Sequence, residues 1–279
     1  MSAPTLLKYN TSVTGTSQML WEKRYTPNSI QHGGYNSVAV NAAGWFGKDS
    51  SSAVGNNWFV HKFDSNGVES TGFPLLFDYM GLDDGIESIA IDSDGNFIVA
   101  GYVTVDATVD HRNWFVRKYS ADGTQILWEE DYDHNGLNDS AHFVTLDRED
   151  NVIVSGYINN GTEATADNDW YIVKYTKDGD GIGGATRIWE QSWDIGNTNG
   201  IAYGMVIDSQ DNVYIVGAQT NGSGLVRPYI QYRDGQTGSL LKSQELSHTV
   251  TNNNNPTAEQ DYIRRIALNG GQLVVAGYF

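Results

Sequence analysis

Residues 91–102 read Ile-Asp-Ser-Asp-Gly-Asn-Phe-Ile-Val-Ala-Gly-Tyr, and this pattern returns at 146–157, at 207–218 and, one residue shorter, at 268–278. Each copy has an apolar segment, a tight polar turn and a second segment, rich in β-branched residues, that runs into a glycine. Two such segments around a short turn predict a β-hairpin. Because the hairpin recurs along the chain, the repeat decides the fold.

A second predicted hairpin accompanies this one in three of the repeats. Its first strand is Asn-Trp-Phe-Val-His-Lys-Phe at 57–63, with counterparts at 113–119 and 169–175. Its turn carries Asn-Gly at 66–67 or Asp-Gly at 122–123, and these pairs supply the positive φ angles that two-residue turns require. The repeating unit is therefore four antiparallel strands, named A, B, C and D in chain order.

Strand A ends at a recurring Asn or Asp: Asn41, Asp92, Asp147, Asp208 and Asn269. The chain opens with a lone C–D hairpin and closes with a lone A–B hairpin, and neither half can bury both of its faces by itself. Five anchors predict five blades, with the two halves paired into one blade that removes the exposed edges. A linear solenoid would need caps at its ends, and no segment of the sequence has that character.

The predicted fold class is all-β, a five-bladed β-propeller of four-stranded antiparallel blades. The ring is expected to close by pairing of the N-terminal C and D strands with the C-terminal A and B strands. Residues 1–279 then form a single domain. Its blades are expected at 33–80, 84–133, 139–194, 200–248 and, for the fifth, 261–279 together with 5–25.

Composition limits the function classes. The 279 residues include 34 acidic and 17 basic side chains, and the net charge of −17 opposes binding to nucleic acid or anionic lipid. The absence of cysteine excludes disulfides and thiolate metal sites. No apolar stretch is long enough for a membrane span, so membrane insertion is not expected.

The units resemble the bacterial β-propeller repeat called SBBP and the related delta-60 repeats. The resemblance rests on the Asp-x-x-Asp/Gly-Asn turn and on the Val-Ala-Gly-Tyr, Trp-Phe-Val-x-Lys-Tyr and Leu-Trp-Glu strands, and it covers about Leu6 to Phe279. It implies a bacterial protein that is extracellular or on the cell surface, without a particular activity. Residues 1–4 lack the character of a signal peptide, so the localisation follows from the resemblance alone.

One face of the predicted propeller carries the variation. The B–C loops are long and dissimilar, whereas most of the other turns are short and repetitive, and binding usually resides in irregular loops on a rigid frame. Eight residues before the anchors lie Gly33, Asp84, Asp139, Gly200 and Asp261. Five residues before them lie Asn36, Glu87, His142, Tyr203 and Arg264. The second row has the phase of core-facing residues yet is polar and different in every blade, as expected at the open end of a channel.

These rows predict a ligand-binding surface. Its residues are Asn36, Asp84, Glu87, Asp139, His142, Tyr203, Asp261 and Arg264, with Trp45 added for stacking because it breaks the tryptophan repeat. The tryptophans that recur at one position of strands C and D are expected to pack inside the blades. The competing interpretation is that the rows only hold channel water and neighbouring backbone. No catalytic residue is assigned, because an Asp that recurs in three blades is expected of a structural contact.

No cofactor and no metal ligand is assigned. Ca²⁺ is the one alternative, at the acidic turns 92–94, 147–150, 178–181 and 208–211, since it binds roughly six to eight oxygens. The repetition of these turns favours hydrogen bonds from the backbone to the Asp side chains instead.

The predicted function is that of a non-catalytic, extracellular or cell-surface module that recognises a protein or a glycan through the face with the B–C loops. Self-association is a further mode of binding. Two alternatives stay open. One is a glycosidase-like hydrolase that uses Asp84, Glu87 and Asp139 at the channel mouth. The other is a structural subunit of a surface layer or filament.

Overall fold

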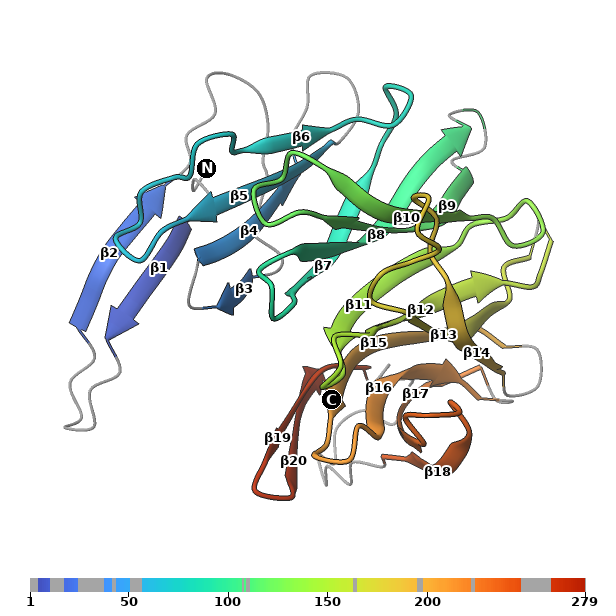
Figure 1. The fold of residues 1–279 in the computed structure, drawn as a ribbon. Helices are drawn as coiled ribbons and strands as arrows, with labels where there is room; N and C mark the ends of the chain where they lie inside the picture. The colour runs from blue at the N-terminus through green and yellow to red at the C-terminus, as the bar shows by residue number, and fades with distance from the viewer. Residues whose placement is uncertain are drawn as a thin grey trace, which may run out of the picture.

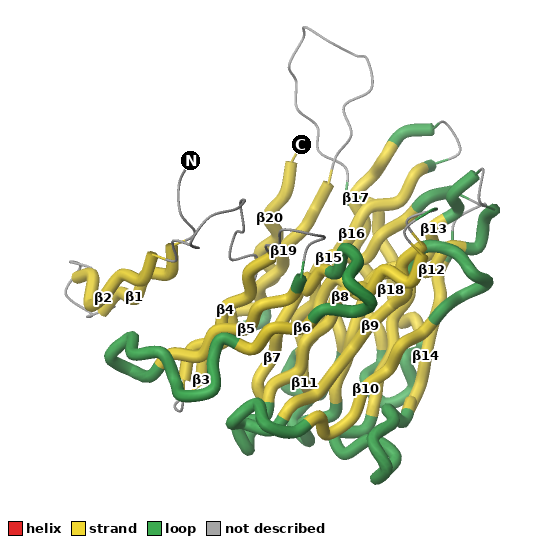
Figure 2. Tube along the Cα trace, turned by 90° about the horizontal axis from the view of Figure 1, so that it is seen from above, coloured by secondary structure: helices red, strands yellow, loops and turns green. Residues whose placement is uncertain are grey.

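The computed structural model describes residues 5–10, 18–24, 38–41, 44–50, 57–106, 108, 111–162, 165–194, 198–221, 224–246 and 262–278. In these ranges every regular element is a β-strand, as Figure 2 shows. The described residues therefore contain no helix that could cross a membrane.

Four sheets each consist of four antiparallel strands that follow one another in sequence, and they are called blades 1 to 4. Blade 1 contains β3 (Val38–Asn41), β4 (Gly44–Ser50), β5 (Trp58–Phe63) and β6 (Leu75–Phe77). Blade 2 contains β7 (Gly85–Ile91), β8 (Phe97–Asp106), β9 (His111–Tyr119) and β10 (Ile126–Tyr132). Blade 3 contains β11 (Ser140–Leu146), β12 (Val152–Asn159), β13 (Asn168–Tyr175) and β14 (Arg187–Trp193). Blade 4 contains β15 (Gly200–Ile207), β16 (Val213–Thr220), β17 (Val226–Arg233) and β18 (Leu240–Glu245).

The two ends of the chain form separate two-stranded sheets. β1 (Thr5–Asn10) pairs with β2 (Gln18–Arg24), and β19 (Tyr262–Asn269) pairs with β20 (Gln272–Tyr278). Figure 1 shows the six sheets along an open arc, with β1 and β2 at one end and β19 and β20 at the other. Among the described residues the predicted fifth blade is therefore not assembled, and the ring is not closed. The fifth blade differs from the other four in how its halves are connected. Its pairing has to join opposite ends of the chain, whereas a short turn fixes each pairing inside blades 1 to 4.

Strand A of each unit lies on the inside of the arc. β3, β7, β11, β15 and β19 follow one another there, each in contact with the next. In an antiparallel meander the starts of strands A and C and the ends of strands B and D lie at the same end of the sheet. The two predicted rows and the B–C loops consequently share one face.

Apolar side chains fill the space between neighbouring blades, and strand C shows how the sequence achieves this. On β13, Trp170 and Ile172 join the core shared with blade 4, whereas Tyr171, Val173 and Tyr175 join the core shared with blade 2. Alternate residues of a strand point to opposite faces, so each blade is buried on both sides. The tryptophans that recur in strands C and D are at most 8% exposed, which confirms their predicted packing role: Trp58, Trp114, Trp128, Trp170 and Trp189.

A recurring lysine ties blade 2 to blade 3 and blade 3 to blade 4. Lys118 Nζ lies 2.7 Å from Asp92 Oδ2 in its own blade and 2.9 Å from the carbonyl oxygen of Lys177 in blade 3. One blade later the same contacts, both at 2.8 Å, involve Lys174, Asp147 and Gly235. Because both lysines are buried, a carboxylate and a carbonyl that satisfy the ammonium group fix the position of one blade against the next.

The acidic turns between strands A and B are held by their own backbone. Asp92 Oδ1 accepts hydrogen bonds from the N–H groups of Asp94 and Asn96, at 3.0 and 2.8 Å. Asp147 and Asp208 repeat this pair of bonds in the next two blades. The predicted hydrogen-bonded turns are thus confirmed at these three positions.

Candidate functional site

The second predicted row coincides with a β-bulge. In blade 2 the pairing of β7 with β8 shifts by one residue between Ile86 and Ser88, which leaves Glu87 as the extra residue. The same shift makes extra residues of His142, Tyr203 and Arg264 in β11, β15 and β19. A bulge bends the strand and turns its extra side chain away from the regular alternation. This explains why a position with the phase of the core is polar in each of these strands.

Three consecutive members of this bulge row are linked through the ring of Tyr203. The ring of His142 meets the ring of Tyr203 edge to face, with centroids 5.5 Å apart, and the guanidinium of Arg264 lies 5.0 Å from the centre of the Tyr203 ring. Burial raises the pKa of Tyr203, although Arg264 acts in the opposite direction. Arg264 is exposed, whereas Glu87, His142 and Tyr203 are half-buried. His142, Tyr203 and Arg264 therefore form a connected polar and aromatic surface that solvent reaches.

Asp139 and Asp84, in the first predicted row, are completely buried. Asp139 uses both oxygens on the backbone: Oδ2 accepts from the N–H of His134 at 2.5 Å and Oδ1 from that of Asn159 at 2.9 Å. Asp84 makes the corresponding bonds in blade 2, at 2.6 and 3.1 Å. Each carboxylate thus clamps the loop that enters its blade to the end of strand B. The recurrence of Asp at this position has this structural cause.

Burial also sets the protonation of these two carboxyls. It raises the pKa of Asp84 to about 6 and that of Asp139 to about 7, against backbone hydrogen bonds that act to lower both values. A raised carboxyl pKa is one property of the general acid of a glycosidase. In Asp84 and Asp139, however, the raised pKa belongs to carboxyl groups whose oxygens face protein backbone and have no exposed surface.

Blade 4 replaces the carboxylate clamp by a different contact. Gly200 stands at the position of Asp139, and a Cβ on it would lie 1.8 Å from Oε1 of Gln219. Gln219 Nε2 donates to Thr198 Oγ1 at 3.0 Å, so the glutamine takes the space of the missing Asp. Of the other predicted residues, Gly33, Asn36 and Asp261 lie outside the described residues, as does the side chain of Trp45.

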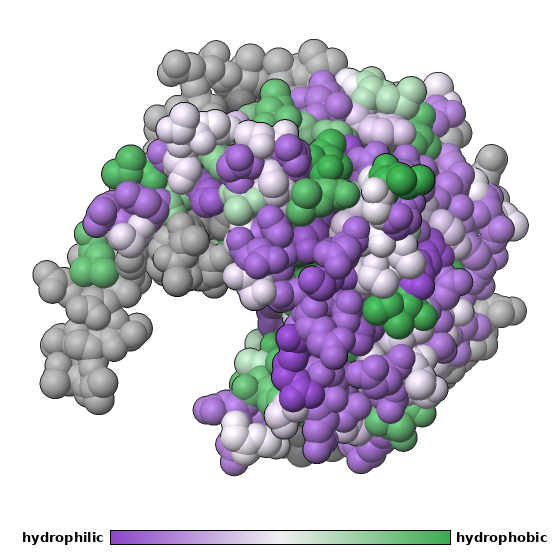
Figure 3. All heavy atoms as spheres, in the orientation of Figure 1, coloured by the Kyte–Doolittle hydropathy of each residue, from purple (hydrophilic) through white to green (hydrophobic). Residues whose placement is uncertain are grey.

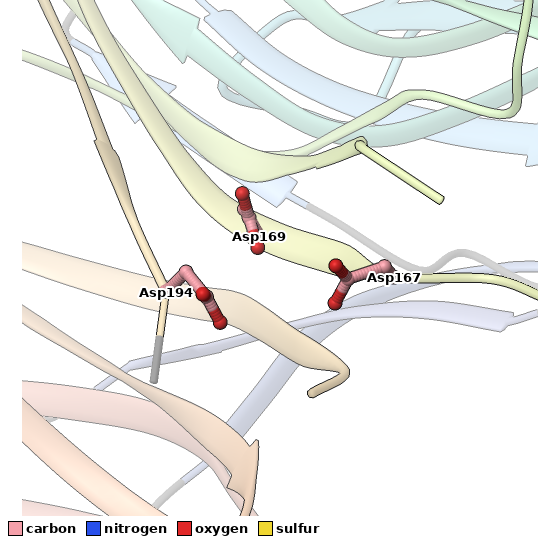
Figure 4. Close-up of side chains that lie close together, drawn as sticks. All are labelled: Asp167, Asp169 and Asp194. Atoms are coloured by element: carbon pink, nitrogen blue, oxygen red, sulfur yellow. The ribbon is translucent and has the colours of Figure 1, made fainter. Parts of the chain in front are cut away.

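A further group of acidic residues on this face was not predicted from the sequence. Asp167 precedes β13, Asp169 belongs to it, and Asp194 follows β14. Oxygens of the three carboxylates lie within 4.8 Å of one another (Figure 4). The available signal was the pattern Asp-x-Asp before Trp170, where the corresponding residues before Trp114 are His111 and Asn113.

The surface around the inside of the arc is mainly hydrophilic, as the space-filling view in Figure 3 shows. Polar groups therefore surround the opening toward which the inner strands converge. Such a surface suits a partner that hydrogen-bonds, and it does not form a large apolar patch on the face in view.

Comparison with known proteins supports the fold. No family model and no curated protein matches the chain. A solved structure of a protein of unknown function from Bacteroides caccae is 12% identical, with a TM-score of 0.51, over 98% of this chain and 82% of that one. Sqt1 from Saccharomyces cerevisiae is 8% identical, with a TM-score of 0.58, over 99% of this chain and 63% of its own. This chain thus spans less than two thirds of Sqt1.

At these identities the likeness concerns the fold alone. Both solved structures are propeller-like, and the four-stranded antiparallel sheets and the all-β content agree with them. The number of five blades and the resemblance to SBBP repeats remain predictions. The chain has a β-propeller-like fold.

Proposed function

We propose that the protein is a non-catalytic binding and scaffolding module outside or on the surface of a bacterial cell, and that it recognises a glycan or a protein through the bulge row. One observation carries the proposal. Four inner strands place an extra residue at the same point of the ladder, yet the four residues differ in chemistry: Glu87, His142, Tyr203 and Arg264. Constant geometry with varied side chains on a rigid repeat scaffold is typical of recognition surfaces.

The first-row carboxylates favour binding over catalysis. A glycosidase needs two carboxyl groups at the substrate, roughly 5–10 Å apart. Asp84 and Asp139 are completely buried and bonded to the backbone, so Glu87 is the half-buried member of the three. Glu87 alone of these three carboxylates can reach a ligand. That is enough for a binding contact, but a glycosidase would need a second carboxyl group as its acid or base.

The working form, in this proposal, is a closed five-bladed ring in which β1 pairs with β20. A pocket of about 310 Å³ between blade 4 and β20 is lined by Ile230, Leu246, Leu273 and Val275, among others. In blade 3 the corresponding side chains of strand C, Val173 and Tyr175, pack into the core shared with blade 2. The repeat assigns Leu7 and Tyr9 of β1 to those two positions. Burying them in the apolar pocket would provide the driving force for closure.

Binding is tested with the labelled full chain on a glycan array, together with sedimentation velocity for self-association. The row variant replaces four residues by alanine: Glu87→Ala, His142→Ala, Tyr203→Ala and Arg264→Ala. It is compared with a control variant that changes Glu149 and Gln236, which are both exposed. We expect glycan signals that the control keeps and the row variant loses. Self-association that persists in the row variant, without any glycan signal, would instead favour the subunit of a surface layer.

Catalysis is tested separately with a panel of fluorogenic glycosides. We expect no turnover by the wild type or by Asp139→Asn. Turnover by the wild type that falls about 100-fold in Asp139→Asn, with folding intact, would establish the glycosidase-like alternative.

A further inference from the structure

Three aspartates converge at the outer part of blade 3. Asp169 is the second residue of β13 and Asp167 directly precedes the strand, so in extended backbone the two side chains point to the same side. Asp194 directly follows β14, which pairs with β13. One oxygen from each carboxylate lies within 4.8 Å of the others, and Figure 4 shows the three side chains around a common space. Two oxygens bound to one Ca²⁺ ion are at most about 4.8 Å apart, so the three oxygens are close enough to share an ion.

Two of these carboxylates have a buried oxygen without a hydrogen-bond partner, Oδ1 of Asp167 and Oδ1 of Asp169. Asp169 is only 6% exposed. Its other oxygen, Oδ2, accepts a hydrogen bond from the side chain of Asn160. Buried carboxylate oxygens are nearly always paired, since desolvation without a partner is unfavourable. The unpaired Oδ1 of Asp169 therefore points to a missing donor or cation, and the two other carboxylates beside it favour a cation.

The electrostatics of the cluster agree with this. The pKa of Asp169 is raised to about 6, chiefly by burial and also by the neighbouring Asp194 and Asp167, against the hydrogen bond from Asn160. Burial and Asp194 also raise the pKa of Asp167. Three carboxylates at this spacing repel one another when all are ionised. A cation between them would remove the repulsion.

Blade 2 offers an internal comparison at the same three positions. The strand registers align Trp114 with Trp170 and Tyr132 with Trp193. The counterparts of Asp167, Asp169 and Asp194 are consequently His111, Asn113 and Asp133. In blade 2, His111 Nε2 lies 3.3 Å from Asp133 Oδ1, and Asn113 donates to Asp131 at 2.7 Å. Blade 2 thus combines one acid with an imidazole and an amide where blade 3 has three acids.

From this geometry we infer that Asp167, Asp169 and Asp194 bind one Ca²⁺ ion, with water completing the coordination. The converging ligands are all oxygen atoms, which suits a hard cation, whereas Zn²⁺ is held mostly by nitrogen and sulfur. Mg²⁺ usually takes one or two carboxylates in a strict octahedron. The ion would join the loop before β13 to the segment that leads from blade 3 into blade 4, on the same face as the bulge row.

Ca²⁺ binding to the full chain is measured by isothermal titration calorimetry and by tryptophan-sensitised Tb³⁺ luminescence. Trp170 and Trp193 are the sequence neighbours of Asp169 and Asp194, so a lanthanide bound there lies near indole donors. We expect one ion per chain, displaced by Ca²⁺ but not by equal concentrations of Mg²⁺. The melting temperature should rise by roughly 5 °C when Ca²⁺ is about 100 times its Kd.

The decisive variant combines Asp167→His with Asp169→Asn, which gives blade 3 the residue set that blade 2 already carries. It should fold, and its affinity for Ca²⁺ should fall about 100-fold or more, because affinity follows the number of ligand charges. The matched control, Asp133→Asn in blade 2, should bind as the wild type does. Equal binding by wild type and double variant would overturn the proposal. So would the absence of binding to the wild type at millimolar Ca²⁺.

Discussion

At the scale of single residues, buried aspartates serve the fold in two opposite electrostatic settings. Burial raises the pKa of Asp92, but hydrogen bonds from Lys118 and Asn96 outweigh it, so the pKa lies below its usual range. Asp139 has backbone N–H groups as its partners, and burial dominates there and raises its pKa to about 7. The first carboxylate favours the folded state when ionised, whereas ionisation of the second works against it.

This difference predicts an unusual pH dependence. The carboxyl of Asp139 titrates near pH 7 when folded and near 3.8 when unfolded, so the folded state binds the extra proton between these values. Its contribution to the free energy of unfolding therefore rises as the pH falls, by about 2–3 kcal/mol between pH 8 and pH 5. Urea titrations of wild type and Asp139→Asn should diverge by this amount toward acid. A constant difference between the two proteins would contradict the raised pKa.

The glycine near the end of strand B has a steric cause that can be tested. A Cβ on Gly156 would lie 2.0 Å from the carbonyl oxygen of Ser140 in β11 and 2.9 Å from the ring of Trp114. Gly156→Ala should lower the free energy of unfolding by about 2–3 kcal/mol, since neither the backbone nor a buried indole can yield easily. The matched control is Gly136→Ala, where a Cβ would have open space although φ is +71°. A smaller loss at Gly156 than at Gly136 would be inconsistent with the close approach.

At the scale of strands and blades, the lysine ties make a separate prediction. Lys174→Met leaves the buried carboxylate of Asp147 and the carbonyl of Gly235 without the ammonium group. We expect a loss of about 3–5 kcal/mol in the free energy of unfolding, measured by chemical denaturation. Lys177→Met is the control, because that side chain is 49% exposed and its ion pair with Asp178 is on the surface. Its loss should stay within about 1 kcal/mol. Similar losses in both variants would refute the tie.

The hairpins and the packing of the recurring tryptophans could be predicted from the sequence, because short turns and period-two alternation are local signals. The bulge was not predicted from the sequence. Glu87 and His142 are polar at positions where the strand alternation calls for core residues, but the register shift is visible only in the pairing of the strands. The acidic cluster was missed because Asp194 joins Asp167 and Asp169 only through the pairing of β13 with β14. Its position depends on register across a hairpin, which residue spacing does not reveal.

At the scale of the whole molecule, the two end sheets, β1–β2 and β19–β20, each have two strands, and among the described residues neither pairs with a further strand. Val274 on β20 is 62% exposed, and the pocket beside Leu273 and Val275 faces blade 4. An unpaired edge with apolar residues tends to recruit another strand. The N-terminal hairpin has the sequence that the other blades use in this place, with Lys8 at the position of Lys118 and Lys174. Closure would thus give the fifth blade the lysine through which blades 2 and 3 contact their neighbours.

The repeat register defines which residues would pair on closure. Ser155 faces Ile172 in blade 3 and Ala100 faces Val116 in blade 2, and the corresponding residues of the split blade are Ala276 and Leu6. Facing Cα atoms in antiparallel strands are about 4.5–5.5 Å apart, which a disulfide can span. The chain has no cysteine of its own, so no other disulfide competes.

The most direct test of the five-bladed ring is therefore disulfide formation in the monomer of Leu6→Cys with Ala276→Cys, followed by non-reducing electrophoresis and peptide mass mapping. Lys8→Cys with Ala276→Cys, two residues out of register, is the control. A closed ring predicts an intramolecular bond in the first variant, little bond in the control, and a higher melting temperature after oxidation. The absence of an intramolecular bond, or equal bond formation in both variants, would contradict closure.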